Sequence, residues 1–585
     1  MTKLEELLQR PDRTNGTVPA GRLPGSFRGR PLEYPIADVV VDVGWGRLIF
    51  GQTFGDPRRL AETLRLEEPG RRDIAMYLTD PHVVMAMAPQ DLFLDPSHTF
   101  RLALADYAPE RRRPAGFGLR QVESLGDAEV VHDLYKKRHM MPPSPEFVWS
   151  QARSRTLTYL VAVDDGSGEI IGVVTGIDHA EAFDDPENGS SLWALAVDPQ
   201  AHQPGIGKAL VRGLAEHFKS RGRALMDLSV MYDNYHAIRL YEKLGFKRVP
   251  VFALKRKNPY NEPLFVADGP EARLNSRAKV VIDEARRRGI YAEVLDEEAA
   301  YFQLKMGGAA VTCRESLSEL TTAVAVSRCT DRAVTHRLLR HAGLAVPEQV
   351  PYADPAGAEA FLARHRRIVV KPARGEEGAG ITVDVRTPEV LEAAVREARQ
   401  VAAPVLLESH VEGLDLRVLV INWRVVAGAV RKPPEVIGTG QHTVRDLIEK
   451  QSRRRAAATG GESRIPIDTE TRACVEAAGH QLDGVPPAGE VVLVRRTSNT
   501  GTGGSMYDVT SRLSNAVCRA AIAAARAIDI PVVGVDFIVP CVGDSAYRII
   551  GTTACPPLTG HEPQPVAERF LDLLFPQSSA RRIRS

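Results

Sequence analysis

The chain lacks a strong bias of charge and lacks long apolar runs. Among its 585 residues, 75 Lys and Arg face 74 Asp and Glu, so the formal net charge is +1 and gives no argument for a nucleic-acid partner. We interpret the short basic tail RRIRS as a solvated end. No apolar run has the length needed to span a bilayer, and the opening MTKLEELLQRPD lacks a signal-peptide core. We therefore expect a cytoplasmic protein without a membrane partner.

Two common chemical motifs are also missing. The sequence has no GxxxxGK[ST], which excludes a P-loop. Its cysteines have no CxxC spacing, so we expect reduced thiols of a cytosolic protein, with neither a metal site nor a disulfide framework. Lone thiols among apolar neighbours are most simply core filling. The six are Cys313, Cys329, Cys474, Cys518, Cys541 and Cys555.

The length predicts three or four domains, because one hydrophobic core does not serve a chain of this size. We predict five segments: a flexible lead-in at 1–35, a small α/β module at 36–116, an alternating strand and helix region at 117–257, a linker at 258–276 and a long α/β region at 277–578. The module contains no chemical motif, so we interpret it as a packing unit. Its stretches VVVDVGWGRLIF and RDIAMYLTDPHVVMAMA read as strands around a helix at 57–66.

Periodicity places the remaining elements. In the third segment we expect strands at 157–163, 170–177 and 225–230 and helices at 208–220 and 234–244. In the last segment we expect helices at 277–288, 331–342, 388–400 and 511–527. Strands are expected there at 367–371, 403–408, 416–421, 424–430, 490–495, 532–538 and 547–551.

A glycine-bearing turn near residue 205 is the first candidate site. Gly205 and Gly207 follow a strand that ends at Val197 and open a helix at Lys208. This arrangement presents free backbone N–H groups and the positive end of a helix dipole to an anion, and a Cβ would hinder close approach of a pyrophosphate. A G-x-G turn alone is equally well explained as a plain structural turn.

The surrounding residues resemble the GNAT acetyltransferases. Their pyrophosphate loop follows R/Q-x-x-G-x-G/A and binds acetyl-CoA; here His202 stands at the Arg or Gln position, with Gln203 beside it. Downstream, Asn234 and AIRLYEKLGF resemble the closing motif of the family. The resemblance implies that Tyr241 is the general acid that protonates the CoA thiolate. It also implies that the coenzyme is bound by Val197, Gln203, Gly205, Gly207, Lys208 and Asn234. The alternative is a packed helical aromatic.

The base for acetyl transfer stays open. The strand at 192–197 carries no glutamate, and Asp178, His179 or a water chain are the alternatives.

The second candidate site begins at Lys371, at the end of a strand, where its charge can reach phosphates. The loop with Gly375, Gly378 and Gly380 can fold over them. Further on, Asp415 and Arg417 stand two apart on one strand face, where they can contact a ribose and clamp a phosphate or carboxylate. The alternative for this pair is a surface ion pair in a hairpin.

These motifs together resemble the ATP-grasp ligases of the cyanophycin synthetase and glutathione synthetase type. DRAVTHRLLRHAGLAVPEQ, ESHVEGLDLR, AVRKPPEVIGTG, RRTSNTGTGG and GVDFIVP occur in the expected order. Such enzymes phosphorylate a carboxylate with ATP and let an amine attack the acyl phosphate. The resemblance implies that Lys371 holds phosphates, Glu408 and Val411 form the adenine hinge, and Asp415 meets ribose. It also implies that Arg417 and Arg431 meet the γ-phosphate or substrate carboxylate, Arg496 and Asn499 line the acceptor side, and Asp536 binds Mg²⁺.

The last strand departs from that family. A Glu-x-Asn that supplies oxygen ligands to Mg²⁺ is replaced by Gly551 and Thr553. Losses around a metal commonly cost about 10–100-fold, so we predict a chain that binds ATP with an impaired ligase step. Thr439, where Asp is usual, and Ala379, where Lys is usual, are smaller departures.

Taken whole, the chain resembles the N-acetylglutaminylglutamine synthetases of bacteria that accumulate dipeptide osmolytes. The resemblance includes WGRLIFGQTF, DPSHTF, DPENGSSLWALAVDPQ and HEPQPVAERFLDLLFP. It implies an α/β (α+β) fold, with a GNAT-type mixed sheet domain followed by an ATP-grasp fold. It further implies that glutamine is acetylated and then coupled to a second glutamine with ATP and Mg²⁺. The alternatives are an acetyltransferase with a regulatory ATP-binding module, and a cyanophycin-type ligase acting on other amino acids.

Overall fold

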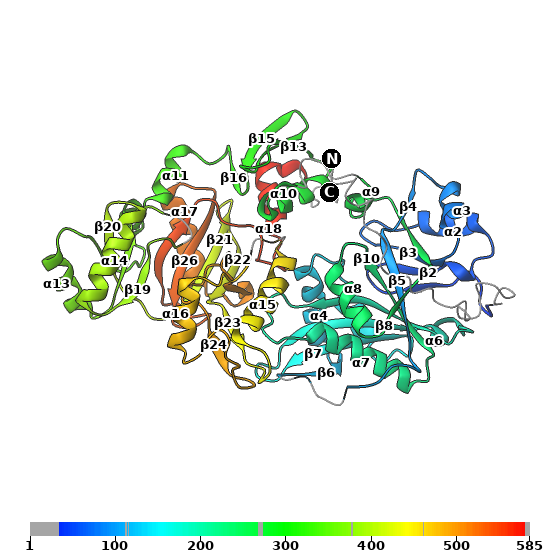
Figure 1. Ribbon diagram of the computed structural model, residues 1–585. Helices are drawn as coiled ribbons and strands as arrows, with labels where there is room; N and C mark the ends of the chain where they lie inside the picture. Colours follow the sequence, from blue (N-terminus) through cyan, green and yellow to red (C-terminus); the bar gives the residue numbers. More distant parts are fainter. Residues whose placement is uncertain are drawn as a thin grey trace, which may run out of the picture.

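The computed structural model describes residues 34–578, except 111–113, 115, 267–272, 376–377, 460 and 462. The predicted lead-in up to residue 33 and the basic tail lie outside the described residues. The chain forms two halves that lie side by side, an N-terminal half (34–266) and a C-terminal half (273–578) (Figure 1).

A five-stranded sheet begins the N-terminal half. Its order is β1 (Val40–Asp42), β2 (Arg47–Phe50), β3 (Ile74–Leu78), β12 (Phe252–Arg256) and β4 (Leu92–Leu94). The helix expected at 57–66 is α2 (Pro57–Arg65), with Asp56 as its N-cap. The stretch PHVVMAMA is helix α3 (Pro81–Met87), so the strand predicted there is wrong. Pro81 at its first turn suits a helix start, because that position needs no N–H donor.

A seven-stranded sheet forms the centre of this half. Its order is β11 (Lys247–Val249), β5 (Ser97–Ala103), β10 (Leu225–Met231), β9 (Ser190–Val197), β8 (Ile170–Asp178), β7 (Leu157–Asp164) and β6 (Phe117–Gln121). The expected hairpin of β7 and β8 and strand β10 are confirmed. Strand β5 pairs with β10, and β12 pairs with β3 and β4. The predicted boundary at residue 116 therefore separates strands that are hydrogen-bonded to each other.

Helices cover both faces of this sheet. They are α4 (Leu125–Lys137), α5 (Pro145–Ser150), α6 (His179–Phe183), α7 (Ile206–Ser220) and α8 (Tyr235–Lys243). Leu210, Val211, Leu214 and Phe218 of α7 are buried in the core. Gly176 on β8 allows this close packing, because a Cβ there would lie 2.5 Å from Leu214 Cδ1.

The segment predicted as a linker packs against the N-terminal half where it is described. It contains the short helix α9 (Glu262–Phe265), and the Arg72 guanidinium donates to the Tyr260 carbonyl at 3.1 Å. Asn261 is buried and donates to the Arg256 carbonyl at 2.8 Å.

Four sheets form the C-terminal half. The first is a meander of β13 (Tyr291–Asp296), β14 (Tyr301–Met306), β15 (Ala309–Arg314) and β16 (Leu317–Ser318). The second has the order β17 (Gln349–Pro351), β20 (Val405–Ser409), β18 (Ile368–Pro372) and β19 (Thr382–Val385). The third has the order β25 (Ser505–Asp508), β22 (Arg424–Lys432), β21 (Leu414–Ile421), β26 (Val532–Val539) and β27 (Arg548–Thr553). The last pairs β23 (Glu435–Ile437) with β24 (Val491–Leu493).

The helices of this half pack on these sheets. They are α10 (Ser276–Arg287), α11 (Ala323–Thr330), α12 (Arg332–His341), α13 (Pro355–His365), α14 (Pro388–Val401), α15 (Val444–Ala458), α16 (Thr469–Ala477), α17 (Asn515–Ile528) and α18 (Val566–Leu574). The helices and strands expected from periodicity in this half are confirmed, although α17 begins four residues later than predicted. The meander and helices α11, α13, α15, α16 and α18 were not expected.

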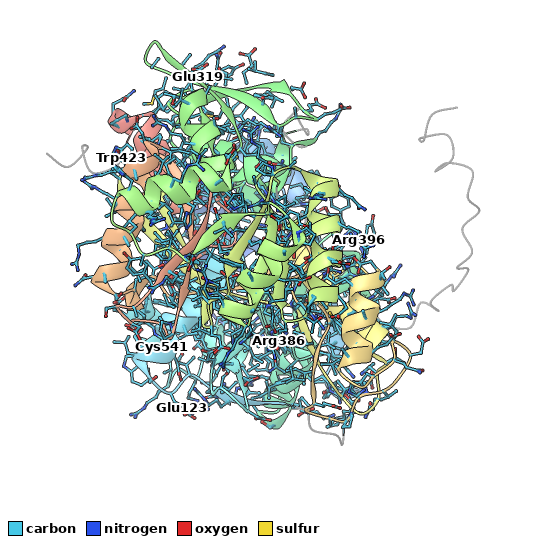
Figure 2. The ribbon with its side chains drawn as sticks, turned by 90° about the vertical axis from the view of Figure 1, so that its left-hand side faces the viewer. Glu123, Glu319, Arg386, Arg396, Trp423 and Cys541 are labelled. Atoms are coloured by element: carbon cyan, nitrogen blue, oxygen red, sulfur yellow. The ribbon has the colours of Figure 1, made fainter. Side chains whose placement is uncertain are left out.

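The surface is charged, and the cysteines are free. Figure 2 shows Arg396 on the outer side of α14, whose Leu391, Ala394 and Val395 are buried. All six cysteines are free thiols. Cys518, expected in the core, is half-buried on α17, and Cys541 is exposed. Over the part of the chain that the structure describes, none of the helices combines the length and the apolar character that a bilayer crossing requires.

Candidate active sites

The loop between β9 and α7 has the geometry of an anion site. Val197 is the last residue of β9, and Gly205 is the N-cap of α7 with a φ of +85° and no side-chain cap. That left-handed conformation favours glycine, and the first N–H groups of the helix have no capping side chain. A Cβ added at Gly205 would meet nothing within 4 Å, so its outer side is open to a ligand.

Strands β9 and β10 separate close to this loop. Their parallel ladder contains only two residue pairs, Ser191 with Asp227 and Leu192 with Leu228. Beyond Leu192, Ala194 adopts a φ of +48°, and the pairing of β9 with β8 shifts register there. The edge of β9 that runs toward Val197 is therefore not paired with β10. Unpaired strand backbone can hydrogen-bond the amide groups of an extended ligand.

Three other residues predicted to bind the coenzyme have protein partners. The side chain of Gln203 donates to the Asp164 carboxylate, and Lys208 Nζ lies 3.0 Å from Glu110 Oε2. Asn234 is the N-cap of α8, because its side-chain oxygen accepts from the Ala237 N–H at 3.2 Å. Gly207 lies in the first turn of α7. These contacts shape the loop and the two helix starts.

Tyr241 is buried in the core of the seven-stranded sheet. It lies on α8, and its ring centroid is 5.7 Å from that of Phe246. Burial raises the pKa of its phenol to about 12, so the group keeps its proton over the physiological range. A protonated phenol fits a proton donor, and its packing also fits the alternative of a core aromatic.

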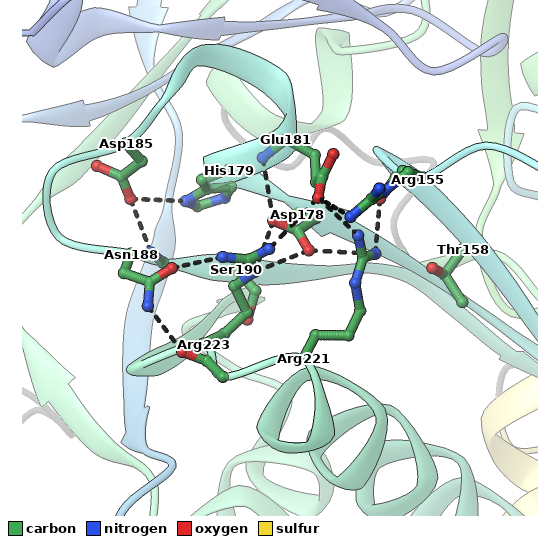
Figure 3. A network of polar contacts seen from close by, with 12 residues as sticks. Arg155, Thr158, Asp178, His179, Glu181, Asp185, Asn188, Ser190, Arg221 and Arg223 are labelled. Carbon is green, nitrogen blue, oxygen red and sulfur yellow. Dashed lines mark hydrogen bonds and ion pairs between the residues drawn. The ribbon is translucent and has the colours of Figure 1, made fainter.

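The two side-chain candidates for the base lie at the far end of β8. Asp178 pairs with Ser190, whereas Val197 beside the glycine loop pairs with Gly172. Figure 3 shows Asp178 between the guanidinium groups of Arg221 and Arg223; Arg223 Nε lies 2.8 Å from the carboxylate. The Asp178 carboxylate is therefore engaged in ion pairs with two guanidinium groups.

His179 has a different environment. Its Nε2 lies 2.8 Å from Ser191 Oγ, one residue before the point where β9 leaves β10. Asp178, His179 and a water chain therefore stay the three alternatives for the base.

The predicted nucleotide residues Lys371 and Glu408 come together in a cavity between two sheets. Lys371 Nζ lies 2.7 Å from Glu408 Oε2, and both side chains are buried. The cavity is also lined by Arg332, His336, Ile550 and Gly551. Val411 lies in the connection from β20 to β21. A buried cation beside a cavity can bind a phosphate when it gives up the ion pair with its carboxylate partner.

The glycine loop beside this cavity is held by Arg332. Its guanidinium donates to the carbonyls of Pro372 and Gly375, both at 2.7 Å. Gly375, Gly378 and Gly380 have φ values of +142°, +83° and +67°. The loop residues Glu376 and Glu377 lie outside the described residues. The sequence gives no sign of this role of Arg332, because an arginine at a helix start carries no motif.

Arginines surround the predicted metal ligand Asp536. Arg417 Nε and Nη2 lie 2.8 and 3.0 Å from its two oxygens, and Arg431 Nη2 lies 3.1 Å away. Arg431 also pairs with Asp415 at 2.7 Å across the β21–β22 hairpin. Burial would raise the pKa of Asp536, but the charges of Arg417 and Arg431 and the hydrogen bonds from Arg417 lower it below its usual range. Arg417 and Arg431, expected to meet the γ-phosphate or substrate carboxylate, thus form one cluster with Asp415 and Asp536.

This cluster does not fit a protein-held Mg²⁺. Gly551 has no ligand atom, and the Thr553 hydroxyl accepts from Arg417 Nη2 at 3.0 Å. Among the described residues no group of three His, Cys, Asp or Glu is arranged to hold a metal ion. At the predicted metal position the described residues offer the Asp536 carboxylate, which two guanidinium groups occupy. In this cluster the guanidinium groups of Arg417 and Arg431 pair with the carboxylates of Asp536 and Asp415.

A buried histidine beside the cluster was missed. His561 is 1% exposed, and neither ring nitrogen has a hydrogen-bond partner. Burial, together with the charges of Arg417 and Arg431, lowers its pKa to about 3, so the ring is neutral. A lone histidine in HEPQP gives no signal in the sequence.

The two predicted acceptor residues lie in or beside the segment before β25. The Asn499 side chain accepts from the Gly501 N–H at 2.9 Å and so shapes this segment. Arg496 is exposed, whereas its neighbour Arg495 is buried against Asp468. Ser498 Oγ lies 3.1 Å from Asp415 Oδ2, which joins the segment to the arginine cluster.

The two halves meet at the glycine loop of the N-terminal half. His202 Nδ1 lies 3.2 Å from the Glu435 carbonyl oxygen, and Nε2 lies 3.1 Å from the Tyr507 hydroxyl. Burial, followed by the nearby charge of Arg455, lowers the pKa of His202 to about 4, so the ring is neutral. The departure from Arg or Gln at this position thus has a physical reason: the side chain faces the other half of the protein.

Comparisons with known proteins show similarity to two classes of enzyme. Residues 128–246 match the acetyltransferase (GNAT) family. The chain is 30% identical to a cyanophycin synthetase of Nostoc sp. over 328 residues, which cover 54% of this chain and 36% of that protein. It is 29% identical to a bifunctional glutathione biosynthesis protein of Listeria innocua, over 51% of this chain and 41% of the relative. The chain spans about two fifths or less of the length of these curated relatives.

A solved structure is also similar. A bifunctional glutathione synthetase from Pasteurella multocida matches 64% of this chain and 50% of its own length, with 19% identity and a TM-score of 0.41. The protein therefore combines a GNAT acetyltransferase domain with homology to the ATP-grasp ligases of the cyanophycin and glutathione synthetase type, in one α/β chain, and both matches indicate an enzyme.

Proposed function

We propose that this protein makes an N-acetylated dipeptide, N-acetylglutaminylglutamine, from acetyl-CoA, ATP and glutamine. We call the connection from Val197 to Gly205 the coenzyme loop and the C-terminal half the ligase half. The observation that carries the proposal is the contact between them through His202, since it brings the two proposed amide-forming sites into one structure. The identity of glutamine rests on the resemblance to the dipeptide synthetases. A role in osmolyte synthesis rests on the same resemblance.

In the first step, the amine of one glutamine attacks the thioester carbonyl of acetyl-CoA. A C–N bond forms, the C–S bond breaks, and the amine proton passes to the base. The phenol of Tyr241 supplies a proton to the departing thiolate. The N–H groups at Gly205 and Gly207 hold the diphosphate, and the free edge of β9 positions the pantetheine amides.

In the second step, a carboxylate oxygen of the acetylated glutamine attacks the γ-phosphorus of ATP, and ADP leaves. The amine of a second glutamine then attacks the acyl phosphate, and inorganic phosphate leaves. Lys371, Arg417 and Arg431 stabilise the negative oxygens. Acetylation removes the charge of the first amine, so only the second glutamine supplies a nucleophile.

An acetyltransferase with a regulatory ATP-binding module is the second candidate. The arrangement around Asp536 favours it, because two arginines occupy the Asp536 carboxylate and Gly551 adds no ligand. In that case the C-terminal half binds adenine nucleotide without forming an acyl phosphate. The same arrangement makes a slow ligase step the expectation under the first proposal.

Product analysis separates these functions. The full-length protein is incubated with acetyl-CoA, ATP, Mg²⁺ and glutamine, and the products are identified by mass spectrometry with ADP measured in parallel. An acetylated dipeptide supports the synthetase, and acetylglutamine without dipeptide or ADP supports the regulatory module. Replacing glutamine by a panel of other amino acids tests the cyanophycin-type alternative. Absence of any acetylated product would refute both the synthetase and the acetyltransferase.

A further inference from the structure

Figure 1 shows α15 of the C-terminal half beside the N-terminal half, and the α15 residue Arg454 contacts the coenzyme loop. The Arg454 guanidinium donates from Nη2 to the Gln203 carbonyl at 2.6 Å and from Nη1 to the Ala201 carbonyl. Both carbonyls lie in the connection between β9 and Gly205. Two parallel bonds from one planar group fix the orientation of a segment as well as its position.

The next residue of the same helix holds a loop of the other site. Arg455 is buried, and its guanidinium donates to the Gly504 carbonyl at 2.7 Å and to Ser505 Oγ at 2.5 Å. These residues end the glycine-rich segment that carries Asn499, on the predicted acceptor side of the ligase. Adjacent arginines on α15 thus hold one loop of each site.

A third residue extends the contact. Gln451 lies one turn before Arg454 and Arg455 on the same side of the helix, and its Nε2 lies 2.9 Å from His202 Nδ1. Gln451 is buried, and burial lowers the pKa of Arg454 to about 10, as for a cation held away from water. The group remains charged at neutral pH, so its hydrogen bonds to the carbonyls are charge-assisted.

We propose that α15 completes the acetyl-CoA site from the ligase half, and that Arg454 is a positioning residue for acetyl transfer. The inference rests on the proposed binding of acetyl-CoA at Gly205. A loop fixed before the coenzyme arrives loses less conformational freedom when it binds, so affinity is higher.

The test compares Arg454→Ala with Arg453→Ala in the full-length protein. Arg453 is the matched control: it is the preceding arginine of α15, half exposed, and pairs with Glu449 at 3.8 Å. The readouts are the dissociation constant of coenzyme A by calorimetric titration, the acetyl-CoA KM and kcat, and amide hydrogen exchange of residues 198–206. Arg454→Lys, which keeps the charge and loses the planar fork, is measured beside them.

We expect Arg454→Ala to weaken coenzyme A binding and raise the acetyl-CoA KM by about tenfold, with kcat changed less than threefold. Hydrogen exchange of the loop should be faster in Arg454→Ala than in the parent. Coenzyme affinity and loop exchange of Arg454→Lys should lie between those of Arg454→Ala and the parent, and those of Arg453→Ala should equal the parent's. If Arg454→Ala does not fold, the lysine variant is judged by the same readouts. Coenzyme affinity and loop exchange equal to the parent in a folded variant would overturn the inference. A parent that binds no coenzyme A would instead refute the proposed function, and loop exchange alone would then decide whether Arg454 holds the loop.

Discussion

Replacing Lys371 by methionine should destabilise the C-terminal half and abolish tight nucleotide binding. Lys371 and Glu408 form an ion pair of 2.7 Å in which the side chains are 6% and 5% exposed. Removing one partner of a buried pair leaves an uncompensated charge, which costs about 3–5 kcal/mol. Gln349 Nε2 still donates to Glu408 at 2.8 Å in the variant. The lower end, about 3 kcal/mol, is therefore expected.

The double variant Lys371→Met/Glu408→Gln separates structure from binding. It removes both charges and leaves an amide oxygen that can accept from Gln349, so the free energy of unfolding should return to within about 1 kcal/mol of the parent. Its affinity for adenine nucleotide should stay low, because the phosphates have lost their cation. In the double variant the stability should therefore recover while the nucleotide affinity does not.

The assay is urea unfolding followed by fluorescence, with titration of a fluorescent ATP analogue on the same samples. A loss of about 3 kcal/mol corresponds to a fall of the melting temperature of about 6 °C for a domain of this size. Unchanged stability of Lys371→Met would refute the account of a buried pair. Nucleotide affinity that recovers together with stability in the double variant would show that Lys371 has only a structural role.

Three further predictions follow from the sites. Tyr241→Phe keeps the ring and should lower kcat for acetyl transfer by about 100-fold or more at a similar KM; a kcat within threefold of the parent means that Tyr241 only packs. The pKa of His202 is lowered to about 4, so between pH 6.5 and 4 the unfolded chain binds a proton that the folded chain does not. Stability therefore falls as the pH drops through that window, by about 2 kcal/mol at pH 5, and His202→Gln should remove this part of the loss in urea unfolding at pH 7 and 5. Gly551→Glu/Thr553→Asn restores the oxygen ligands beside Asp536 and should raise glutamine-dependent ADP formation by about tenfold or more; equal, fast turnover in both proteins would contradict an impaired ligase step.

Local patterns predicted most elements of the central sheet and of the ligase core. The hairpin of β7 and β8 was predicted because alternating apolar residues flank a DDGSGE turn, and α7 because its apolar residues recur at helical spacing. The pattern misled at α3, where VVMAMA reads as a strand although Asp80-Pro81 starts a helix. Helices α15 and α16 were not predicted because charged and small residues obscure their apolar sides.

The sequence by itself determined which chemical groups are available. Glycines before a helix can bind one anion, and a lysine at a strand end with spaced arginines can bind another. Position 551 carries no carboxylate. Those properties belong to residue types and short spacings, which the chain carries before it folds. Only the tertiary structure decided that Arg417 and Arg431 enclose Asp536, that His561 is buried beside them, and that α15 reaches the coenzyme loop. These pairs are far apart in sequence, so their meeting depends on how the sheets and halves pack and not on any local pattern.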